Sequence, residues 1–259
     1  MGLKCVLLGA GNLATNLGFE LKRKGYKIIQ VYSHTAQSAE MLANKLETAC
    51  TTLPESITRD TDVYFVVLKD SVVEEILAAI DFDNKPLIHC SGSLSLSVLK
   101  KFSENTGVLY PLQTFSKNRE VNFFEIPLFI EGSSESNLLL VKSIASDLSG
   151  DVKVANSEER LIIHIAAVFA NNFVNHCYTI SELILNKYGF RFEILKPLIR
   201  ETADKVRSLS PVKAQTGPAI RFDDTIIGRH LAVLSEDPEL ADLYKRISES
   251  IFKFYQKQD

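Results

Sequence analysis

The sequence predicts an α/β fold of the Rossmann type followed by an all-α domain. An apolar strand-like run breaks into Gly9-Ala10-Gly11 and resumes as a helical pattern, the order of a dinucleotide-binding turn. Strand-like and helical patterns then alternate to residue 155, as in a parallel sheet covered by helices. Residues 157–188 contain neither proline nor glycine, and helical patterns follow. We predict a dinucleotide-binding domain over 1–155 and a helical domain for substrate binding and dimerisation over 156–259.

Composition excludes several classes of protein. The 259 residues are 46% hydrophobic and carry a net charge of -3, and no basic stripe indicates nucleic-acid binding. No apolar run reaches the roughly 18 residues that span a bilayer. The chain enters its first strand without a signal-peptide pattern, so we expect a cytoplasmic protein. The four cysteines are far apart and form no C-x-x-C pair, so we expect neither a metal site nor a disulfide framework.

Each element of the sheet domain follows from a local pattern. Strands are predicted where short runs of β-branched and aromatic residues lie between turn residues: 3–8, 27–32, 62–67, 86–90, 108–110 and 128–131. Helices are predicted where apolar residues recur at helical spacing: 12–24, 36–44, 72–79 and 136–148, then 157–188, 192–209, 224–234 and 238–257. Ligands of such a sheet bind at the carboxyl ends of its strands.

The first strand end has the residues that a pyrophosphate needs. Gly9 permits the tight turn, Gly11 allows close backbone approach, and Ala14 allows the helix to pack against the strand. The helix N-terminus presents free N–H groups to phosphates. The alternative is a glycine-rich turn without a ligand. The cofactor-binding candidates in this segment are Gly9, Ala10, Gly11, Asn12, Leu13 and Ala14.

The next strand ends complete the predicted cofactor site. After the second strand come Ser33, His34 and Thr35, where an NAD-specific protein carries an acid for the ribose 2′-OH. Because no acid is present, we favour NADP over NAD, although no arginine is adjacent. Turns after the third and fourth strands add the further candidates Leu68, Lys69, Asp70, Ser91 and Gly92. Asp70 and Ser71 are equally suited to capping the following helix, and Gly92 to a simple turn.

The long helix carries polar residues on an apolar background. Residues 161–170 are apolar nearly all round, which predicts burial by the same domain or by a partner subunit in a homodimer. At 100° per residue, His164, Asn171 and Asn175 fall within about 40° of one another, with Asn172 nearby. Two explanations stay open, because buried amides and imidazoles need hydrogen-bond partners. These side chains bond to neighbouring backbone and helices, or they line a cleft facing the nicotinamide.

Two loops carry further candidates. The loop 110–116 leaves the fifth strand and contains Gln113, and the loop 214–224 contains Thr216 and Arg221. Arg221 suits a substrate carboxylate or phosphate as well as it suits an ion pair with Asp223 or Asp224.

These motifs together carry a resemblance. G-A-G-N-L-A, H-C-S-G-S, Y-P-L-Q-T-F-S, the His164 helix with its paired asparagines, and Q-T-G-P-A-x-R-x-D before His230 resemble a family of Rossmann-like proteins over nearly the whole chain. Its members are described as NADP oxidoreductases with a C-terminal domain of unknown function. More distantly the chain resembles pyrroline-5-carboxylate reductase, deazaflavin-dependent NADP reductases, and 6-phosphogluconate and 3-hydroxyacid dehydrogenases, which implies a helical domain of the 6-phosphogluconate dehydrogenase-like type.

The resemblance implies a function but not a complete mechanism. The hydroxyacid dehydrogenases carry a catalytic lysine four residues before a paired asparagine, and Ala167 and Val168 stand there in this chain. We therefore predict an NADP-dependent oxidoreductase that transfers hydride between NADPH and a small carbonyl or imine substrate in an interdomain cleft. The catalytic candidates are His164, Asn172 and Arg221, and the substrate-binding candidates are Gln113, Asn171 and Thr216. The alternative is a non-catalytic NADP-binding sensor or scaffold.

Overall fold

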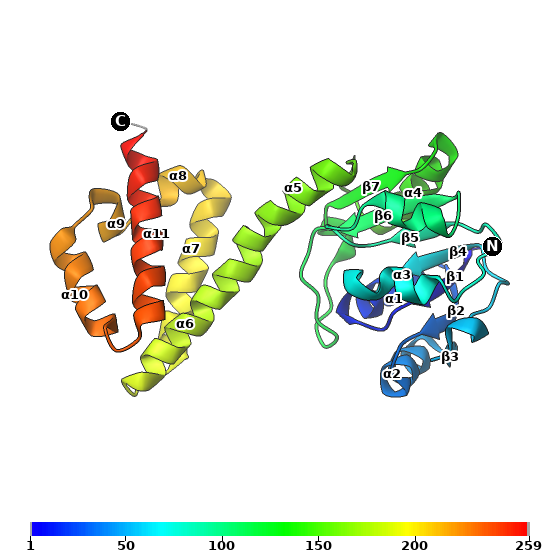
Figure 1. Ribbon diagram of the computed structural model, residues 1–259, viewed down its shortest axis with the longest axis horizontal. Coiled ribbons are helices and arrows are strands. Elements are labelled where there is room, and N and C mark those ends of the chain that lie inside the picture. Colours follow the sequence, from blue (N-terminus) through cyan, green and yellow to red (C-terminus); the bar gives the residue numbers. More distant parts are fainter. Residues whose placement is uncertain (1, 258–259) are drawn as a thin grey trace. The chain divides into compact units, whose positions relative to one another are not determined.

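The computed structural model describes residues 2–257. Its contacts divide the chain into a first unit up to Cys177 and a second unit from Tyr178, and Figure 1 shows the elements of both. Within the described residues, no helix is both long enough and apolar enough to cross a membrane. The predicted domain division at residue 155 stays a prediction.

The first unit is built on one eight-stranded sheet in the order β3-β2-β1-β4-β5-β6-β7-β8. The strands are β1 Lys4–Leu8, β2 Lys27–Tyr32, β3 Ala49–Thr51, β4 Val63–Val66, β5 Leu87–His89, β6 Thr106–Pro111, β7 Leu128–Gly132 and β8 Val152–Val154. The Rossmann-type prediction is confirmed. The two strands that the sequence did not predict, β3 and β8, have three residues each, too few to show an alternating pattern.

One strand pair departs from the predicted parallel sheet. β6 and β7 are antiparallel, whereas the other neighbouring strands are parallel. A parallel pair requires a crossover that returns the chain to the starting edge, usually through an α-helix. Residues 112–127 contain only the one-turn helix η4 Phe123–Glu125, so the chain turns back and β7 runs the other way.

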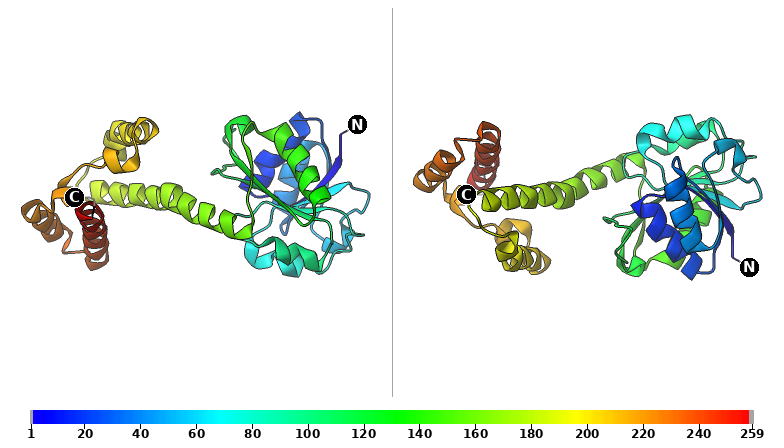
Figure 2. Two further views of the ribbon diagram at one scale, coloured as in Figure 1. Left: turned by 90° about the horizontal axis from the view of Figure 1, so that it is seen from above. Right: turned by 90° about the horizontal axis from the view of Figure 1, so that it is seen from below.

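Helices cover both faces of this sheet (Figure 2). One face packs against α1, α2 and α4, and the other packs against α3 and the 3-10 helix η3. The helical elements before the long helix are α1 Asn12–Arg23, α2 Ala36–Leu46, η1 Pro54–Ser56, η2 Asp70–Val72, α3 Val73–Leu77, η3 Leu96–Lys101, η4 and α4 Glu135–Leu148. The apolar residues of β1 alternate between the two faces, which explains why a two-sided core forms.

The long helix predicted over 157–188 forms, but it is not α-helical throughout. It consists of α5 Ser157–Ala167, the π-helical segment η5 Val168–Phe173 and α6 Val174–Lys187. The side chain of Asn156 accepts hydrogen bonds from the backbone of Glu158 and Glu159 and starts α5 as a capping box. Of the two alternatives for residues 161–170, burial by the same domain is not observed, because Ile162 and Phe169 are 66% and 63% exposed; burial by a partner subunit stays a prediction.

The second unit is all-helical. It contains the end of α6, η6 Phe192–Leu195, α7 Lys196–Ser208, α8 Pro211–Ala214, α9 Pro218–Arg221, α10 Asp224–Leu234 and α11 Pro238–Gln256. The sequence did not predict the single turns α8 and α9, which both begin with proline. α9 packs on α11, and the rings of Phe222 and Phe252 stack with centroids 4.5 Å apart.

Candidate functional site

The glycine turn after β1 has the geometry that a dinucleotide-binding loop requires. Gly9 has φ +131°, and a Cβ there would lie 2.2 Å from the carbonyl oxygen of Val67, so only glycine fits. Gly11 is the N-cap of α1 without a capping side chain, and a Cβ there would meet nothing within 4 Å. Open space therefore lies in front of uncapped N–H groups, as a pyrophosphate needs. Ala14 is fully buried against the sheet.

The turn that follows β2, Ser33 to Thr35, contains no acid. The Ser33 N–H donates to Thr51 O at 3.2 Å, while His34 and Thr35 are exposed. Thr35 is the N-cap of α2, but its side chain makes no capping hydrogen bond. These hydroxyl and imidazole groups are consequently available to a ligand at this edge.

Asp70 links the turns that follow β4 and β5. Its Oδ2 accepts from Ser93 Oγ at 2.6 Å and from Ser91 Oγ at 2.9 Å. Ser91 Oγ in turn accepts from the backbone N–H groups of Ser93 and Leu94. Asp70 therefore does not cap the following helix, which was one of the two interpretations of this turn. The carboxylate instead ties together two loops that the sequence placed at the cofactor site.

His164 lies against the same strand end. A Cβ on Gly92 would come within 2.8 Å of His164 Nδ1 and of Tyr110 Cζ. The Tyr110 hydroxyl is 3.2 Å from His164 Nδ1, and the two rings meet edge to face with centroids 6.0 Å apart. The absence of a side chain on Gly92 allows both rings to approach the turn after β5. The structure thus brings His164 together with the Ser91-Gly92 turn.

A buried arginine anchors the helix that carries His164. Arg160 is fully buried, and its Nη1 donates to Glu131 Oε2 on β7 at 2.5 Å. Its Nη2 donates to Leu94 O at 2.6 Å, and Ser157 Oγ donates to the same Glu131 carboxylate. Sequence reasoning missed these residues, and it included Tyr110 in a loop motif without giving it a role. A charged residue directly before an all-apolar run was the signal that could have identified Arg160, since buried charges are almost always paired.

A second histidine is buried beneath the site. His89 is 1% exposed, and its Nδ1 accepts from the Ser91 N–H at 3.2 Å. Burial, and to a smaller extent the positive charge of Arg160, lowers the pKa of His89 to about 3. His89 is therefore neutral at physiological pH, with its proton on Nε2, and it supports the turn through Nδ1.

The predicted substrate-binding residues of the first unit are exposed. The backbone N–H of Thr114 donates to Gln113 Oε1 at 2.8 Å, within one loop. Asn171 and Asn172 lie in the π-helical segment η5. Because a π turn contains more residues than an α turn, the 100° step that aligned His164 with Asn171 does not hold across this segment. π-Helical turns inside α-helices occur frequently at functional sites.

Thr216 and Arg221 belong to the second unit. Thr216 is exposed, and Arg221 is the exposed last residue of α9. Asp223 caps α10 by accepting from the Ile226 N–H. Among the ion pairs of the described chain, none joins Arg221 to Asp223 or Asp224, so that interpretation of Arg221 is not supported.

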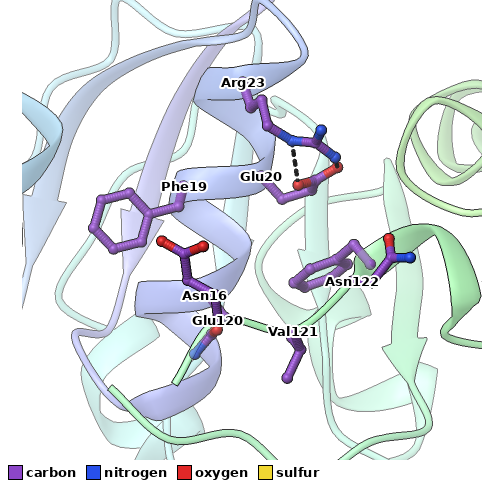
Figure 3. A pocket seen from close by; sticks show the side chains of 8 residues that line it. Asn16, Phe19, Glu20, Arg23, Glu120, Val121 and Asn122 are labelled. Atoms are coloured by element: carbon purple, nitrogen blue, oxygen red, sulfur yellow. Dashed lines mark hydrogen bonds and ion pairs between the residues drawn. The ribbon is translucent and has the colours of Figure 1, made fainter. Parts of the chain in front are cut away.

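A separate cavity of about 540 Å³ lies between α1 and the loop 120–123. Figure 3 shows Glu20 and Arg23 meeting at its wall, where Arg23 donates twice to the Glu20 carboxylate at 2.6 and 2.8 Å. Asn16 Nδ2 donates to Ser116 O and holds the loop to the helix. None of the predicted site residues lines this cavity, so it is distinct from the strand-end site.

Two family models match the sequence. Residues 4–92 match the NADP oxidoreductase, coenzyme F420-dependent family. Residues 126–251 match a domain of unknown function, number 2520. The first match covers the glycine turn and the Ser91-Gly92 turn, and the second covers the helix that carries His164. Among curated proteins, none matches the chain.

Solved structures share the fold over the whole chain. A Bacteroides fragilis protein provisionally described as an NADP oxidoreductase is 46% identical, with a TM-score of 0.91, over 97% of this chain and 98% of that one. A 1-pyrroline-5-carboxylate reductase of Streptococcus pyogenes is 15% identical, with a TM-score of 0.61, over 97% and 99%. An imine reductase of Myxococcus stipitatus in complex with NADP⁺ is 12% identical, with a TM-score of 0.63, over 98% and 93%. The last two share the fold alone.

Proposed function

Because the chain belongs to the family of Rossmann-type proteins described as NADP oxidoreductases, with a C-terminal domain of unknown function, we propose that it is an NADPH-dependent reductase of a small carbonyl or imine substrate. One observation carries the proposal. His164 lies against Gly92 at the carboxyl end of β5, the edge of the sheet where the Gly9-Ala10-Gly11 turn also lies. A proton donor and a dinucleotide cradle therefore share one edge.

The residues present fit a nicotinamide dinucleotide. The turn from Gly9 to Ala14 and the uncapped N-terminus of α1 would hold the pyrophosphate. Ser33, His34 and Thr35 would receive the 2′-phosphate, because no carboxylate stands there to repel it. The turns that Asp70 ties together would hold the remainder. When bound, NADPH supplies a hydride to an acceptor carbon.

The protein's own contribution is binding, orientation and a proton. His164 is half-buried and presents an imidazole, the side chain that most often acts as a general acid in enzymes. Asn172 is proposed to orient the substrate, and Asn171, Gln113 and Thr216 to contact it. Arg221 is proposed to bind a substrate anion. The cleft between the two domains belongs to the same proposal.

A homodimer also belongs to this proposal. Leu161, Ile162, Ile165 and Phe169 are exposed on the long helix, and apolar patches of this kind mark protein interfaces. The occupant that we propose is a second copy of this helix. The patch continues along one helix. Residues 161–173 contain no Asp, Glu, Lys or Arg, so the patch offers nothing to attract a charged partner.

The test is a cofactor titration followed by turnover. We expect NADPH to bind more tightly than NADH, as followed by cofactor fluorescence. Gly11→Val places a side chain in the open space before α1 and should abolish binding of both cofactors, whereas Gly228→Val enters open space in the second unit and should not. NADPH consumption is then measured with cyclic imines and keto acids. Equal affinity for NADH rejects the preference, and tight binding without any turnover favours a sensor.

A further inference from the structure

We propose that Tyr110 is a positioning residue, which holds the His164 imidazole with Nδ1 as hydrogen-bond acceptor and directs Nε2–H to the substrate. The inference rests on the proposed role of His164. The Tyr110 hydroxyl lies 3.2 Å from Nδ1. Within residues 2–257, no hydrogen bond is made by Nε2. One ring nitrogen is thus bound inside the protein, and the other is left for a ligand.

Two residues lie against the imidazole, and a third anchors the helix that carries it. Gly92 contacts it from the turn after β5, where an added Cβ would be 2.8 Å from Nδ1. Tyr110 meets it edge to face at 76°. One helical turn earlier, Arg160 ties α5 to Glu131 and to Leu94 O, which fixes the rotation of the helix about its axis. A ring held in this way keeps its geometry without help from the substrate.

The hydroxyl suits both charge states of the imidazole. It donates to Nδ1 when the ring is neutral, and it accepts from Nδ1–H when the ring is cationic. Burial raises the pKa of the Tyr110 phenol, and the charge of Arg160 opposes this rise only in part. Tyr110 therefore keeps its proton and is not itself the acid.

His164 alone would supply the proton that the reaction needs. Bound NADPH would supply the hydride to the substrate carbon, and the negative charge that would develop on the substrate oxygen or nitrogen calls for a proton. The Nε2–H bond of the imidazolium breaks, its electron pair stays on Nε2, and the new O–H or N–H bond forms. The neutral ring then retains Nδ1–H, which donates to the Tyr110 oxygen until solvent restores the second proton. Tyr110 keeps the ring in place while its charge changes.

The test is nuclear magnetic resonance of the protein with ¹⁵N-labelled histidine. The chain has five histidines, and His164→Gln assigns the signals of interest. At a pH where the ring is neutral, we expect Nδ1 to resonate as an unprotonated, hydrogen-bonded nitrogen. Tyr110→Phe should move this signal to the position of a free nitrogen or split it between tautomers. Tyr64→Phe is the matched control, because its buried hydroxyl bonds to Thr58 O, away from the site.

Gly92→Ala provides a second variant. Its added Cβ would lie 2.8 Å from both His164 Nδ1 and Tyr110 Cζ, so it should push the two rings out of hydrogen-bond distance. The same change of signal is therefore expected, even if Tyr110→Phe fails to fold. A wild-type ring that is neutral, without substrate, and carries its proton on Nδ1 overturns the proposal. It is equally overturned if Tyr110→Phe alters the His164 signals no more than Tyr64→Phe does.

A second arm separates this inference from the proposed function. In protein labelled with ¹⁵N at both glycine and histidine, adding NADPH should shift the signals of Gly11 and of the His164 ring together. If Gly11 responds and His164 does not, the proposed role of His164 fails while the hydrogen bond to Tyr110 stands. Once a substrate is known, Tyr110→Phe should lower kcat and leave KM unchanged. The loss of kcat should be smaller than the roughly 10²–10⁴-fold loss expected when the acid itself is removed.

Discussion

The sheet and the helices of this chain bury their apolar side chains to very different extents. The sheet of the first unit has a core on both faces, in which residues such as Leu7, Phe65 and Ile130 are fully buried. From residue 156 to 257, by contrast, Ala219 and Ile227 are the only buried apolar residues, and 18 of the 24 exposed large apolar side chains of the described chain lie there. The sheet is complete in one chain, whereas the helices have apolar surface left to bury.

Two tyrosine–histidine pairs of the chain also differ in how far they are buried. Tyr110 and His164 pair beside Gly92, where Tyr110 is 8% exposed. His230 and Tyr244 pair at 2.7 Å in the second unit, but both lie on helices with exposed surroundings. A hydrogen bond is stronger and better oriented where water is excluded. This difference supports the proposal that the first pair takes part in the chemistry and that the second is surface structure.

The largest expected effect tests the difference between the two tyrosine–histidine pairs directly. His164→Gln should lower kcat by about 10²–10⁴-fold, the usual contribution of a general acid, and leave NADPH affinity unchanged. His230→Gln is the matched control and should change neither quantity. Steady-state kinetics and cofactor fluorescence measure both variants. Equal losses of kcat in the two variants would show that the burial of the first pair has no bearing on catalysis.

The next effect concerns the apolar surface of the long helix. Ile162→Glu combined with Phe169→Glu should turn a dimer into a folded monomer, since each large apolar side chain buried at an interface contributes about 1.5–3 kcal/mol. Leu139→Glu is the control, because Leu139 on α4 is 60% exposed and Ile162 is 66% exposed. Light scattering at micromolar concentration gives the result. If the wild-type protein is a monomer in this measurement, the predicted dimer is wrong.

Predictability from sequence follows the same division. Strands such as Lys27–Tyr32 and the helix Asp224–Leu234 were predicted with their observed bounds, because local periodicity and capping residues determine them. The contact between Tyr110 and His164 spans 54 residues, and no local pattern encodes such a contact. The π-helical segment escaped prediction for another reason. Its sequence shows no signal that distinguishes a π turn from an α turn, so a constant 100° step misplaced Asn171 relative to His164.

A smaller effect tests the difference in packing between the sheet and the helices of the second unit. Gly9→Ala should destabilise the fold by at least about 2 kcal/mol, because φ is +131° and the new Cβ would lie 2.2 Å from Val67 O. Gly228→Ala should instead stabilise it by about 0.5–1 kcal/mol, since this glycine lies inside α10 and faces open space. Urea unfolding monitored by circular dichroism compares them. Equal changes would contradict the view that only the sheet is tightly packed.

The smallest effect is a pH dependence that the burial of one histidine produces. Burial lowers the pKa of His89 to about 3 from an ordinary value of 6.5, so between these values the unfolded chain binds a proton that the folded chain does not. The free energy of unfolding is then highest above pH 6.5 and falls as the pH falls, by up to about 1.4 kcal/mol per pH unit.

Replacing this histidine isolates its share of the pH dependence. His89→Asn removes the titration and keeps an acceptor for the Ser91 N–H, so the variant should lose less stability than the wild type between pH 7 and pH 5. His230→Gln, in the exposed pair, should leave the slope unchanged. Denaturant unfolding at the two pH values gives the difference. Parallel wild-type and His89→Asn profiles would mean that water reaches the imidazole, and the core beneath the site would then be less closed than its burial indicates.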